Sequence, residues 1–363
     1  MCEKGLYIHI PFCKTKCNYC DFYSLNNINE YADKYIDAVI RELGRYSSFK
    51  ANTLYLGGGT PSVIGPKNLA RLLNAVNKKF GPFSEATLEA NPGDNLTEVF
   101  KTAKNYGINR VSLGVQSGVD EELKILGRRH NTDDAKRTVE ALHKVGLTNY
   151  SLDLMIGIPH QTESSLAQSV NFLTSLEPCH ISSYLLKIEE GTPFFKMQNS
   201  LNLPDSDTAA ELYLQSVNLL EEKGFLQYEI SNFAKEGFEA KHNLKYWNCE
   251  EYIGIGPSAH GFLGGKRYYY PRSLEGFIKN PTPVFDCDGG GYSEYLMLKL
   301  RLKSGVDLAE FENRFSLSTS ALIKKAQLFK NAGYITLNGN NLALTARGFL
   351  VSNTIISEFL NCL

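Results

Sequence analysis

The chain has 363 residues, of which 43% are hydrophobic and 21% are charged, and its formal net charge at pH 7 is −1. This composition is typical of a globular protein with one large domain and a smaller one, and the dispersed, balanced charges exclude a dedicated surface for nucleic acid. No apolar run approaches the ~18 residues of a membrane span, and MCEKGLYIHIPFC is not a secretory signal, so we expect a cytoplasmic protein without disulfides.

Short apolar runs alternate with amphipathic stretches over the first half of the chain. Strands are predicted at 6–10, 53–58, 86–91, 110–116, 150–159 and 180–188. Helices are predicted between them at 31–47, 66–79, 96–105, 132–145 and 163–176. Because six β–α repeats of this kind build a parallel sheet with crossover helices, the fold class is predicted as α/β. The pattern alone leaves open whether the sheet is flat and open or curved into a partial barrel.

The pattern changes after about residue 190. A long helix is predicted at 207–223, and the stretches HNLKYWN and YIGIGPSAHGFLGGKRYYYP are predicted as strands and loops packed on the sheet. From Ser293 onward, three helices and a hairpin turning at Asn338-Gly339 form a winged-helix pattern. We therefore expect units at 1–190, 191–290 and 291–363, the last of them a winged-helix-like α+β domain.

Three of the eight cysteines, Cys13, Cys17 and Cys20, lie in one short segment directly after the first predicted strand. A tetrahedral zinc site needs four ligands, usually as two close pairs, whereas the remaining cysteines are scattered singly. A thioredoxin-like redox pair would use only Cys17 and Cys20. Three thiolates on one loop suit a [4Fe–4S] cluster that keeps one iron open for another ligand. The alternative is three incidental cysteines, which we disfavour because reduced cysteines rarely crowd a polar loop.

The spacing C-x3-C-x2-C after a first strand resembles the signature of radical S-adenosylmethionine (SAM) enzymes. The resemblance implies that the methionine end of SAM binds the open iron, and that one electron from the cluster cleaves SAM to a 5′-deoxyadenosyl radical. In that superfamily a glycine-rich loop, one β–α unit later, meets the SAM amino group. The run LYLGGGTPS, with Gly57, Gly58 and Gly59, stands at that place, where missing side chains allow close approach of a ligand.

A closer resemblance is to the oxygen-independent coproporphyrinogen III oxidase family and its relatives. The segments HIPFC, LEANPG, GVQS, LGRRH and DLMIGIPHQT follow in the family's order. The resemblance implies a core that is a partial (β/α)6 barrel. Carboxylates and an amide at strand ends suit ribose hydroxyls or an amine, and an arginine suits a carboxylate. The SAM pocket implied by the family consists of Tyr7, Tyr19, Gly58, Gly59, Thr60, Glu89, Gln116, Arg128 and Asp153.

Three features depart from the oxidases and resemble the HemW-type haem chaperones of the same family. Phe22 stands where the oxidases have a further cysteine, and only 12 residues precede Cys13. HNLKYW, His242 to Trp247, matches the chaperones' H-N-x-x-Y-W motif. His242 could ligate haem iron while Tyr246 and Trp247 stack on the macrocycle. The alternative is a structural motif that anchors the C-terminal segment through a satisfied His–Asn pair and a buried tryptophan.

The chaperone resemblance implies a protein that binds haem and passes it to soluble or membrane-associated haem proteins. It implies a [4Fe–4S] cluster, bound SAM and a one-electron donor, and it leaves room for a dimer that depends on the cluster. The resemblance predicts SAM binding but not turnover, so no enzymatic activity is assigned. His260 is a weaker candidate for a haem ligand, and His9 is expected to orient the cluster loop.

Two other functions compete with this interpretation. The enzymatic one is oxygen-independent decarboxylation of two propionates of coproporphyrinogen III to vinyl groups, against which Phe22 and the short N-terminal segment argue. The other is a DNA-binding regulator with a redox-sensing cluster. Its third predicted helix has only Lys324, Lys325 and Lys330 as basic residues, so we expect no nucleic-acid partner.

Overall fold

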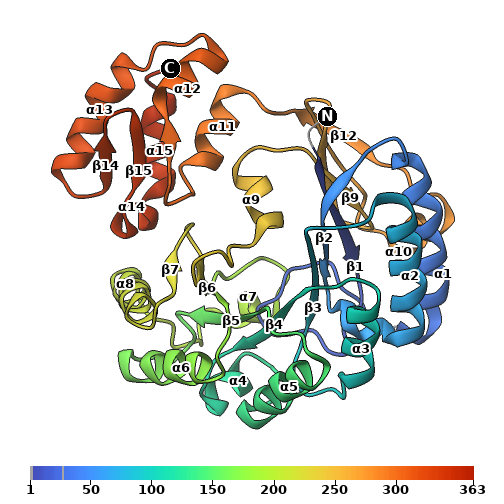
Figure 1. Cartoon of the computed structure of the whole chain (residues 1–363). Helices are drawn as coiled ribbons and strands as arrows, with labels where there is room; N and C mark the ends of the chain where they lie inside the picture. Colours follow the sequence, from blue (N-terminus) through green and yellow to red (C-terminus); the bar gives the residue numbers. More distant parts are fainter. Residues whose placement is uncertain (1–2, 27) are drawn as a thin grey trace.

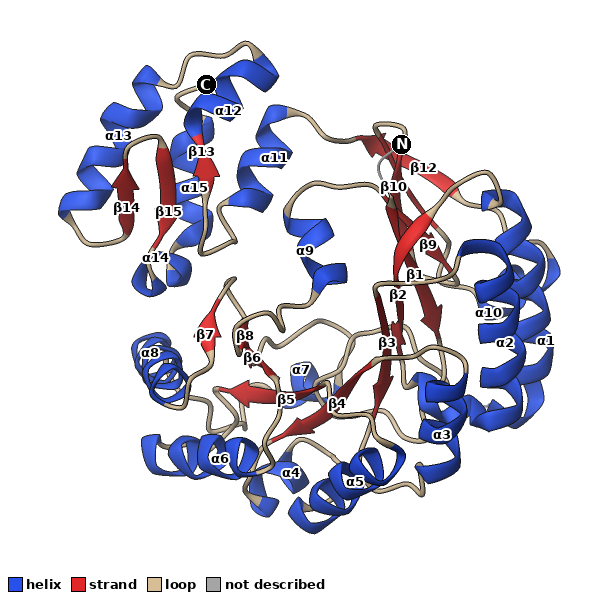
Figure 2. Cartoon of the chain, viewed as in Figure 1, coloured by secondary structure: helices blue, strands red, loops and turns tan. Residues whose placement is uncertain are grey.

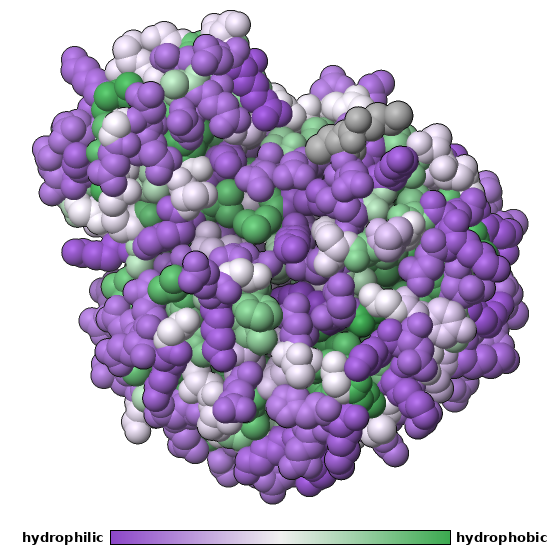
Figure 3. All heavy atoms as spheres, viewed as in Figure 1, coloured by the Kyte–Doolittle hydropathy of each residue, from purple (hydrophilic) through white to green (hydrophobic). Residues whose placement is uncertain are grey.

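The computed structural model describes residues 3–26 and 28–363, and Cys2 lies outside them. Its largest element is a twelve-stranded sheet that curves around a central space, with helices on its outer side (Figure 1 and Figure 2). A three-stranded antiparallel sheet belongs to the C-terminal part of the chain. The face drawn in Figure 3 is mostly hydrophilic over the outer helices. Among the described helices, none combines the length and the apolar character that crossing a membrane requires.

Six parallel strands form the middle of the large sheet and follow one another in chain order. They are β1 (Lys4–Ile10), β2 (Ala51–Gly58), β3 (Glu85–Ala90), β4 (Arg110–Gln116), β5 (Tyr150–Ile156) and β6 (His180–Leu185). The helical elements between them are α1 (Ile28–Glu42), η1 (Leu43–Tyr46), η2 (Pro61–Ile64), α2 (Gly65–Phe80), α3 (Thr97–Asn105), α4 (Asp120–Ile125), α5 (Thr132–Val145) and α6 (Glu163–Ser175). The predicted α/β class and the six β–α units are confirmed, and the curved sheet stays open.

Local sequence determines several helix ends. Helix α5 covers 132–145, as predicted, because Asn131 and Asp134 form a reciprocal capping box at its start. Its end is set by Gly146, whose φ of 72° lies in the left-handed region that glycine adopts at low cost. The helix predicted at 31–47 instead begins at Ile28 and passes into the short 3-10 helix η1.

Strands from the segment after residue 190 extend both edges of the same sheet. They are β7 (Leu226–Gln227), β8 (Asn232–Ala234), β9 (Tyr252–Ile255), β10 (His260–Leu263), β11 (Lys266–Tyr269) and β12 (Val284–Asp288). β8 pairs antiparallel with β6, while β9 pairs parallel with β1 and leads to β10, β11 and β12. The prediction that these stretches pack on the sheet is therefore wrong, because they continue it.

The helices of this segment are α7 (Pro193–Met197), α8 (Ser206–Glu222), α9 (Lys241–Trp247) and α10 (Leu274–Lys279). α8 confirms the helix predicted at 207–223. The HNLKYWN stretch, expected among strands and loops, forms helix α9 instead. Its first turn is held by a carboxylate from a distant strand, as described below, which a local pattern does not reveal.

The C-terminal part contains the predicted three helices followed by a hairpin. These are α11 (Tyr292–Lys299), α12 (Leu308–Phe315), α13 (Ser320–Asn331), β14 (Ile335–Asn338) and β15 (Asn341–Leu344). A short strand, β13 (Val306–Asp307), completes the small sheet in the order β13-β15-β14. Two further helices, α14 (Ala346–Leu350) and α15 (Ser352–Leu360), follow the hairpin and were not predicted.

Side chains alternate along the parallel strands between an apolar and a polar side. In β4, Val111, Leu113 and Val115 are fully buried in the core between sheet and helices. Ser112 and the other residues of the opposite face point into the central space, which we call the lumen. Parallel strands covered on both faces are usually apolar throughout. The polar inner face therefore marks the lumen, not the helix layer, as the place for a ligand.

Helix α9 lies inside the curve of the sheet, beside the starts of β2 and β3 (Figure 1). The Glu85 carboxylate at the start of β3 accepts hydrogen bonds from the N–H groups of Lys241 (2.9 Å) and His242 (2.8 Å). The Tyr228 hydroxyl accepts another from the N–H of Ala240 (3.2 Å). These bonds satisfy N–H groups that a helix start leaves without intrahelical partners. α9 thereby closes the end of the lumen at which the strands begin.

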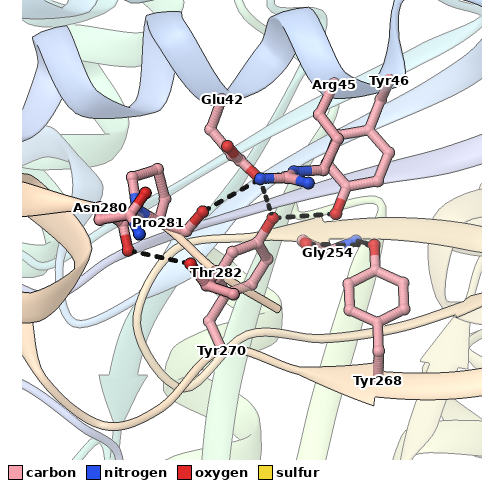
Figure 4. A network of polar contacts seen from close by, with 9 residues as sticks. All are labelled: Glu42, Arg45, Tyr46, Gly254, Tyr268, Tyr270, Asn280, Pro281 and Thr282. Atoms are coloured by element: carbon pink, nitrogen blue, oxygen red, sulfur yellow. Dashed lines mark hydrogen bonds and ion pairs between the residues drawn. The ribbon is translucent and has the colours of Figure 1, made fainter. Parts of the chain in front are cut away.

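A buried polar network joins the first helix to the strands that extend the sheet beyond β1 (Figure 4). The Glu42 carboxylate accepts hydrogen bonds from the Tyr270 hydroxyl and from Arg45 Nε. The Tyr46 and Tyr270 hydroxyl oxygens lie 2.9 Å apart, and Arg45 also donates to the Pro281 carbonyl at 3.2 Å. Because Glu42 is only 5% exposed, its carboxylate depends on these donors in place of water.

We predict that Tyr270→Phe lowers the free energy of unfolding by about 1–3 kcal/mol, since the buried carboxylate loses a donor. Urea denaturation at neutral pH measures the change. Tyr269→Phe is the matched control, because its hydroxyl makes no hydrogen bond among the described residues. Its effect should stay within about 0.5 kcal/mol. Equal effects of the two variants would contradict the prediction.

Candidate functional site

A cavity of about 390 Å³ opens at the end of the lumen where the parallel strands finish. The carboxyl ends of strands are where parallel α/β folds bind ligands. The cavity brings together most of the residues predicted for the site. These are Cys13, Cys17, Tyr19, Cys20, Gly58, Gly59, Thr60, Glu89, Gln116, Arg128 and Asp153.

The three cysteines lie on the loop between β1 and α1. Its start and end are joined, because the Cys13 N–H donates to the Leu25 carbonyl and the Leu25 N–H donates to the Pro11 carbonyl, both at 2.9 Å. All three cysteines are unbridged and partly exposed. Burial, with smaller contributions from the neighbouring Cys17 and Cys13, raises the pKa of Cys20 to about 11. Thiolates on this loop therefore need a compensating positive charge.

The donor set fits an iron–sulfur cluster better than a single metal ion. In the part of the chain that the structure describes, no group of three or more His, Cys, Asp or Glu side chains could hold one ion. The three thiols instead border one open cavity, which suits a polynuclear group that keeps its ligands apart. Arg128 Nη1 donates to Cys17 Sγ at 3.4 Å, and Thr60 Oγ1 lies 3.4 Å from Cys13 Sγ.

The glycine loop after β2 packs directly against the start of the cysteine loop. Gly58 has φ of 111°, and a Cβ there would lie 2.5 Å from the His9 ring. A Cβ on Gly59 would lie 2.5 Å from the Phe12 carbonyl oxygen. The Gly59 N–H donates to the Ile10 carbonyl at 2.9 Å. Only glycine allows this approach of the two loops.

His9 and Tyr7, both on β1, hold the cysteine loop through a pair of hydrogen bonds. His9 Nε2 lies 2.8 Å from the Tyr23 carbonyl oxygen on that loop, and its Nδ1 lies 3.0 Å from the Tyr7 hydroxyl. Burial lowers the pKa of His9 to about 4, so the ring is neutral at pH 7. The bond to Tyr23 agrees with the expected orienting role of His9. Tyr7, predicted in the SAM pocket, does not line the cavity, and its hydroxyl pairs with His9, which does not line the cavity either.

Two carboxylates reach the cavity floor, Glu89 from β3 and Asp153 from β5, with β4 between these strands. Glu89 accepts hydrogen bonds from the Tyr55 hydroxyl (2.8 Å) and from the Gly58 N–H (3.1 Å). Burial nevertheless raises the pKa of Glu89 to about 7, and burial raises that of Asp153 to about 6. The Ser112 hydroxyl donates to Asp153 at 3.5 Å. A cationic or hydroxyl-bearing ligand would offset the cost of keeping both groups ionised.

Arg128 is held over the cavity by backbone and side-chain acceptors. Its Nη2 donates to the Gly114 carbonyl and to Asn91 Oδ1. Asn91 Nδ2 donates in turn to Thr60 Oγ1 at 2.7 Å, which links the arginine to the glycine loop. Sequence analysis did not single out Asn91, although it stands two residues after Glu89, where strand alternation points to the same face.

A second arginine, also missed from the sequence, lies deeper in the lumen. Arg110 is 2% exposed, and its side chain makes no hydrogen bond or ion pair that the described residues supply. Its charge counteracts part of the burial effect on the pKa of Glu89 and of Asp153. In strand register it stands beside Thr87, whose buried hydroxyl also lacks a partner. The lumen between α9 and the cavity is therefore polar and charged.

The H-N-x-x-Y-W motif does not face the cavity. His242 is fully buried in α9, with Nδ1 2.8 Å from Thr53 Oγ1 and Nε2 2.8 Å from the Tyr246 hydroxyl. Burial lowers the pKa of His242 to about 3. Iron ligation would require breaking one of these bonds, so the placement agrees with a structural role for His242. The details differ from the structural alternative, because the partners are Thr53 and Tyr246 in place of an asparagine, and Trp247 is half-buried. His260 lies on β10 beside Tyr269, and it too is absent from the cavity lining.

Comparisons with known proteins agree with this geometry. Residues 7–173 match the Radical SAM superfamily, and residues 292–351 match the HemN C-terminal domain. The heme chaperones HemW of Lactococcus lactis, Bacillus subtilis and Escherichia coli are 36%, 35% and 34% identical to this chain. Each match covers 98% of the chain and 96%, 99% and 98% of the respective relative.

A solved structure shows the same fold. The coproporphyrinogen III oxidase HemN of Escherichia coli, a radical SAM enzyme, superposes with a TM-score of 0.83. The superposition covers 98% of this chain and 90% of the oxidase, at 19% sequence identity. At that identity the likeness establishes the fold and not the reaction.

We predict that Glu89 destabilises the cofactor-free protein above neutral pH. Unfolded glutamate has a pKa of about 4.3, whereas burial raises the folded value to about 7. A glutamate whose folded pKa is raised contributes its full stabilisation of the folded protein below the unfolded pKa. That contribution is lost as pH rises through the folded pKa. Between pH ~4.5 and ~8, wild type should therefore lose about 1–3 kcal/mol of unfolding free energy relative to Glu89→Gln. Urea denaturation across this range measures the difference.

Glu98→Gln serves as the control for this pH series. Glu98 is exposed on α3 and outside the cavity, so its replacement should change the unfolding free energy by no more than about 0.5 kcal/mol at any pH in this range. A flat difference for Glu89→Gln as well would contradict the prediction.

Proposed function

Because the chain belongs to the heme chaperone HemW family of the radical SAM superfamily, we propose that it binds haem and passes it to haem proteins. The likeness to HemW chaperones over 98% of the chain carries this proposal. The proposed recipients are soluble or membrane-associated haem proteins, and cytoplasmic residence belongs to the same proposal. A nucleic-acid partner is not proposed, since the basic residues of α13 are too few.

We assign a [4Fe–4S] cluster to Cys13, Cys17 and Cys20. When bound, such a cluster supplies one iron open to SAM and a source of one electron. Arg128 Nη1, 3.4 Å from Cys17 Sγ, is oriented to neutralise thiolate charge or to meet a carboxylate beside it. The cavity shared by the three thiols supports the assignment. An external one-electron donor is part of the proposal.

SAM is assigned to the polar floor of the same cavity. Glu89 can accept hydrogen bonds from an ammonium group, and the close approach of the glycine loop leaves backbone groups within reach of a ligand. Asp153 and Gln116 suit ribose hydroxyls. The preserved pocket supports binding of SAM; whether SAM is cleaved is not part of the proposal.

The second candidate is oxygen-independent coproporphyrinogen III oxidase activity. The observation that favours it is the superposition with HemN of Escherichia coli. Against it, Phe22 is 64% exposed at the cavity, in the position where the family's oxidases have a further cysteine. The chaperone function therefore remains the better-supported of the two.

We predict that alanine at any one of Cys13, Cys17 or Cys20 abolishes the brown chromophore of anaerobically reconstituted protein. With two remaining thiolates, the cluster loses a ligand that the loop does not replace. Visible absorbance and iron content measure the loss. Cys179→Ala, whose thiol is free and outside the cavity, should retain both. A full cluster in all three loop variants would overturn the ligand assignment.

We predict one saturable haem site per chain in reconstituted wild-type protein. A difference-absorbance titration should show a Soret band that saturates at a ratio of about one. A coproporphyrinogen III decarboxylation assay with SAM and a reductant runs in parallel and should show no vinyl product. Decarboxylation without saturable haem binding would reverse the order of the two candidates.

A further inference from the structure

The mouth of the cavity bears exposed apolar side chains from two directions. Phe22, 64% exposed, comes from the cysteine loop after β1. Tyr184 and Leu185, 40% and 41% exposed, come from the end of β6. Since β1 and β6 are the first and last of the six parallel strands, these side chains border the same opening from its two sides. We call these three residues the mouth rim.

The mouth rim differs sharply from the cavity floor beneath it. The floor contains Glu89, Asp153 and Arg128. An apolar macrocycle placed on them would remove their polar partners and water, which costs free energy for each buried charged group. The rim instead leaves apolar surface in contact with water, which is unfavourable until something covers it. A flat, apolar ligand therefore gains the most binding free energy by lying across the mouth, where it covers apolar surface, and not by entering the polar floor.

Charged groups flank the mouth rim on the solvent side. Lys16, also part of the cavity lining, makes no ion pair with the carboxylates of the described residues. Lys187 Nζ and a Glu189 carboxylate oxygen lie 2.6 Å apart. Asp21 is a further charged residue of the cavity lining. A ligand that is apolar in its body and anionic at one edge can thus cover the rim and place its acidic edge beside Lys16.

We propose that haem binds at this mouth, with its ring against Phe22, Tyr184 and Leu185 and its propionates toward Lys16. The proposal rests on the proposed chaperone function, whose cargo it locates. At the opposite end of the lumen, both ring nitrogens of His242 are already paired, so that histidine would have to break a hydrogen bond to ligate iron. The haem seat is thus separate from the H-N-x-x-Y-W motif and adjoins the cluster and SAM site.

The test is a haem titration of reconstituted Phe22→Ser and of a matched control, Phe285→Ser. Phe285 is 58% exposed on β12 and does not line the cavity, so the two substitutions remove the same side chain from similar exposure. Phe22→Ser should weaken haem binding roughly ten- to a hundredfold, as expected when a buried phenylalanine contact is lost. Phe285→Ser should bind haem like wild type, and both variants should keep iron content and SAM affinity.

A second variant is needed because Phe22 lies two residues after Cys20, so Phe22→Ser could also disturb the cysteine loop. Leu185→Ser changes the other side of the mouth and leaves that loop intact. It should also weaken haem binding, by about tenfold. If Phe22→Ser fails to assemble its cluster, Leu185→Ser decides the question.

Three results would overturn the proposal. Wild-type haem affinity in both mouth variants would remove haem from the mouth. Loss of binding in His242→Gln, with an unchanged unfolding transition and normal affinity in the mouth variants, would assign haem to α9. Normal haem affinity but failed transfer to apomyoglobin in Phe22→Ser would make the mouth rim a docking surface for the recipient. Failure of wild type itself to bind haem saturably would instead defeat the chaperone function.

Discussion

The alternation of side chains along six parallel strands is the constraint on which this structure depends. Apolar residues of each strand face the helices and build the core, which leaves the opposite face free to be polar. A buried polar face is stable only if its groups bind one another. The part of the lumen near α9 meets this condition only in part: His180 lies 2.7 Å from Ser151 Oγ and 2.8 Å from the Tyr228 hydroxyl, whereas the Arg110 Nε and Thr87 Oγ1 atoms lack partners among the described residues.

The two ends of the lumen differ in how fully their polar groups are paired. At the lower end, the carboxylate of Glu85 and the ring of His242 are satisfied within the chain by α9 and its neighbours. At the upper end, Glu89 and Asp153 are held near charges and donors that do not offset their burial. The carboxylates at the cavity end of the lumen are therefore free to bind a ligand, because they contribute little to the stability of the protein.

Sequence reasoning succeeded where the signal is local. The β–α repeats, the capping residues of α5 and the spacing of the three cysteines are all read within short windows. It failed for α9, whose start is held by Glu85, a residue 156 positions earlier in the chain. It predicted strands in YIGIGPSAHGFLGGKRYYYP, where β9, β10 and β11 form, but not that they extend the large sheet, because joining an existing edge depends on which edge is free after the core has formed.

The sequence predicted most of the residues that line the candidate site, but not which side chains are buried away from it. Glu89 and Asp153 lie toward the carboxyl ends of β3 and β5, on either side of β4, so their meeting at one edge of the sheet follows from the parallel topology. Tyr7 and His242 were assigned to ligands, yet their side chains point to partners inside the protein. Arg110 was overlooked because a charged first residue of a strand usually lies in solvent, and only the curvature of the sheet buries it. The mouth rim and the charged floor belong to one cavity. If the proposed haem and SAM seats are both occupied, a ring lying across the mouth would slow the exchange of a ligand on the floor, so bound haem would lengthen the residence time of SAM.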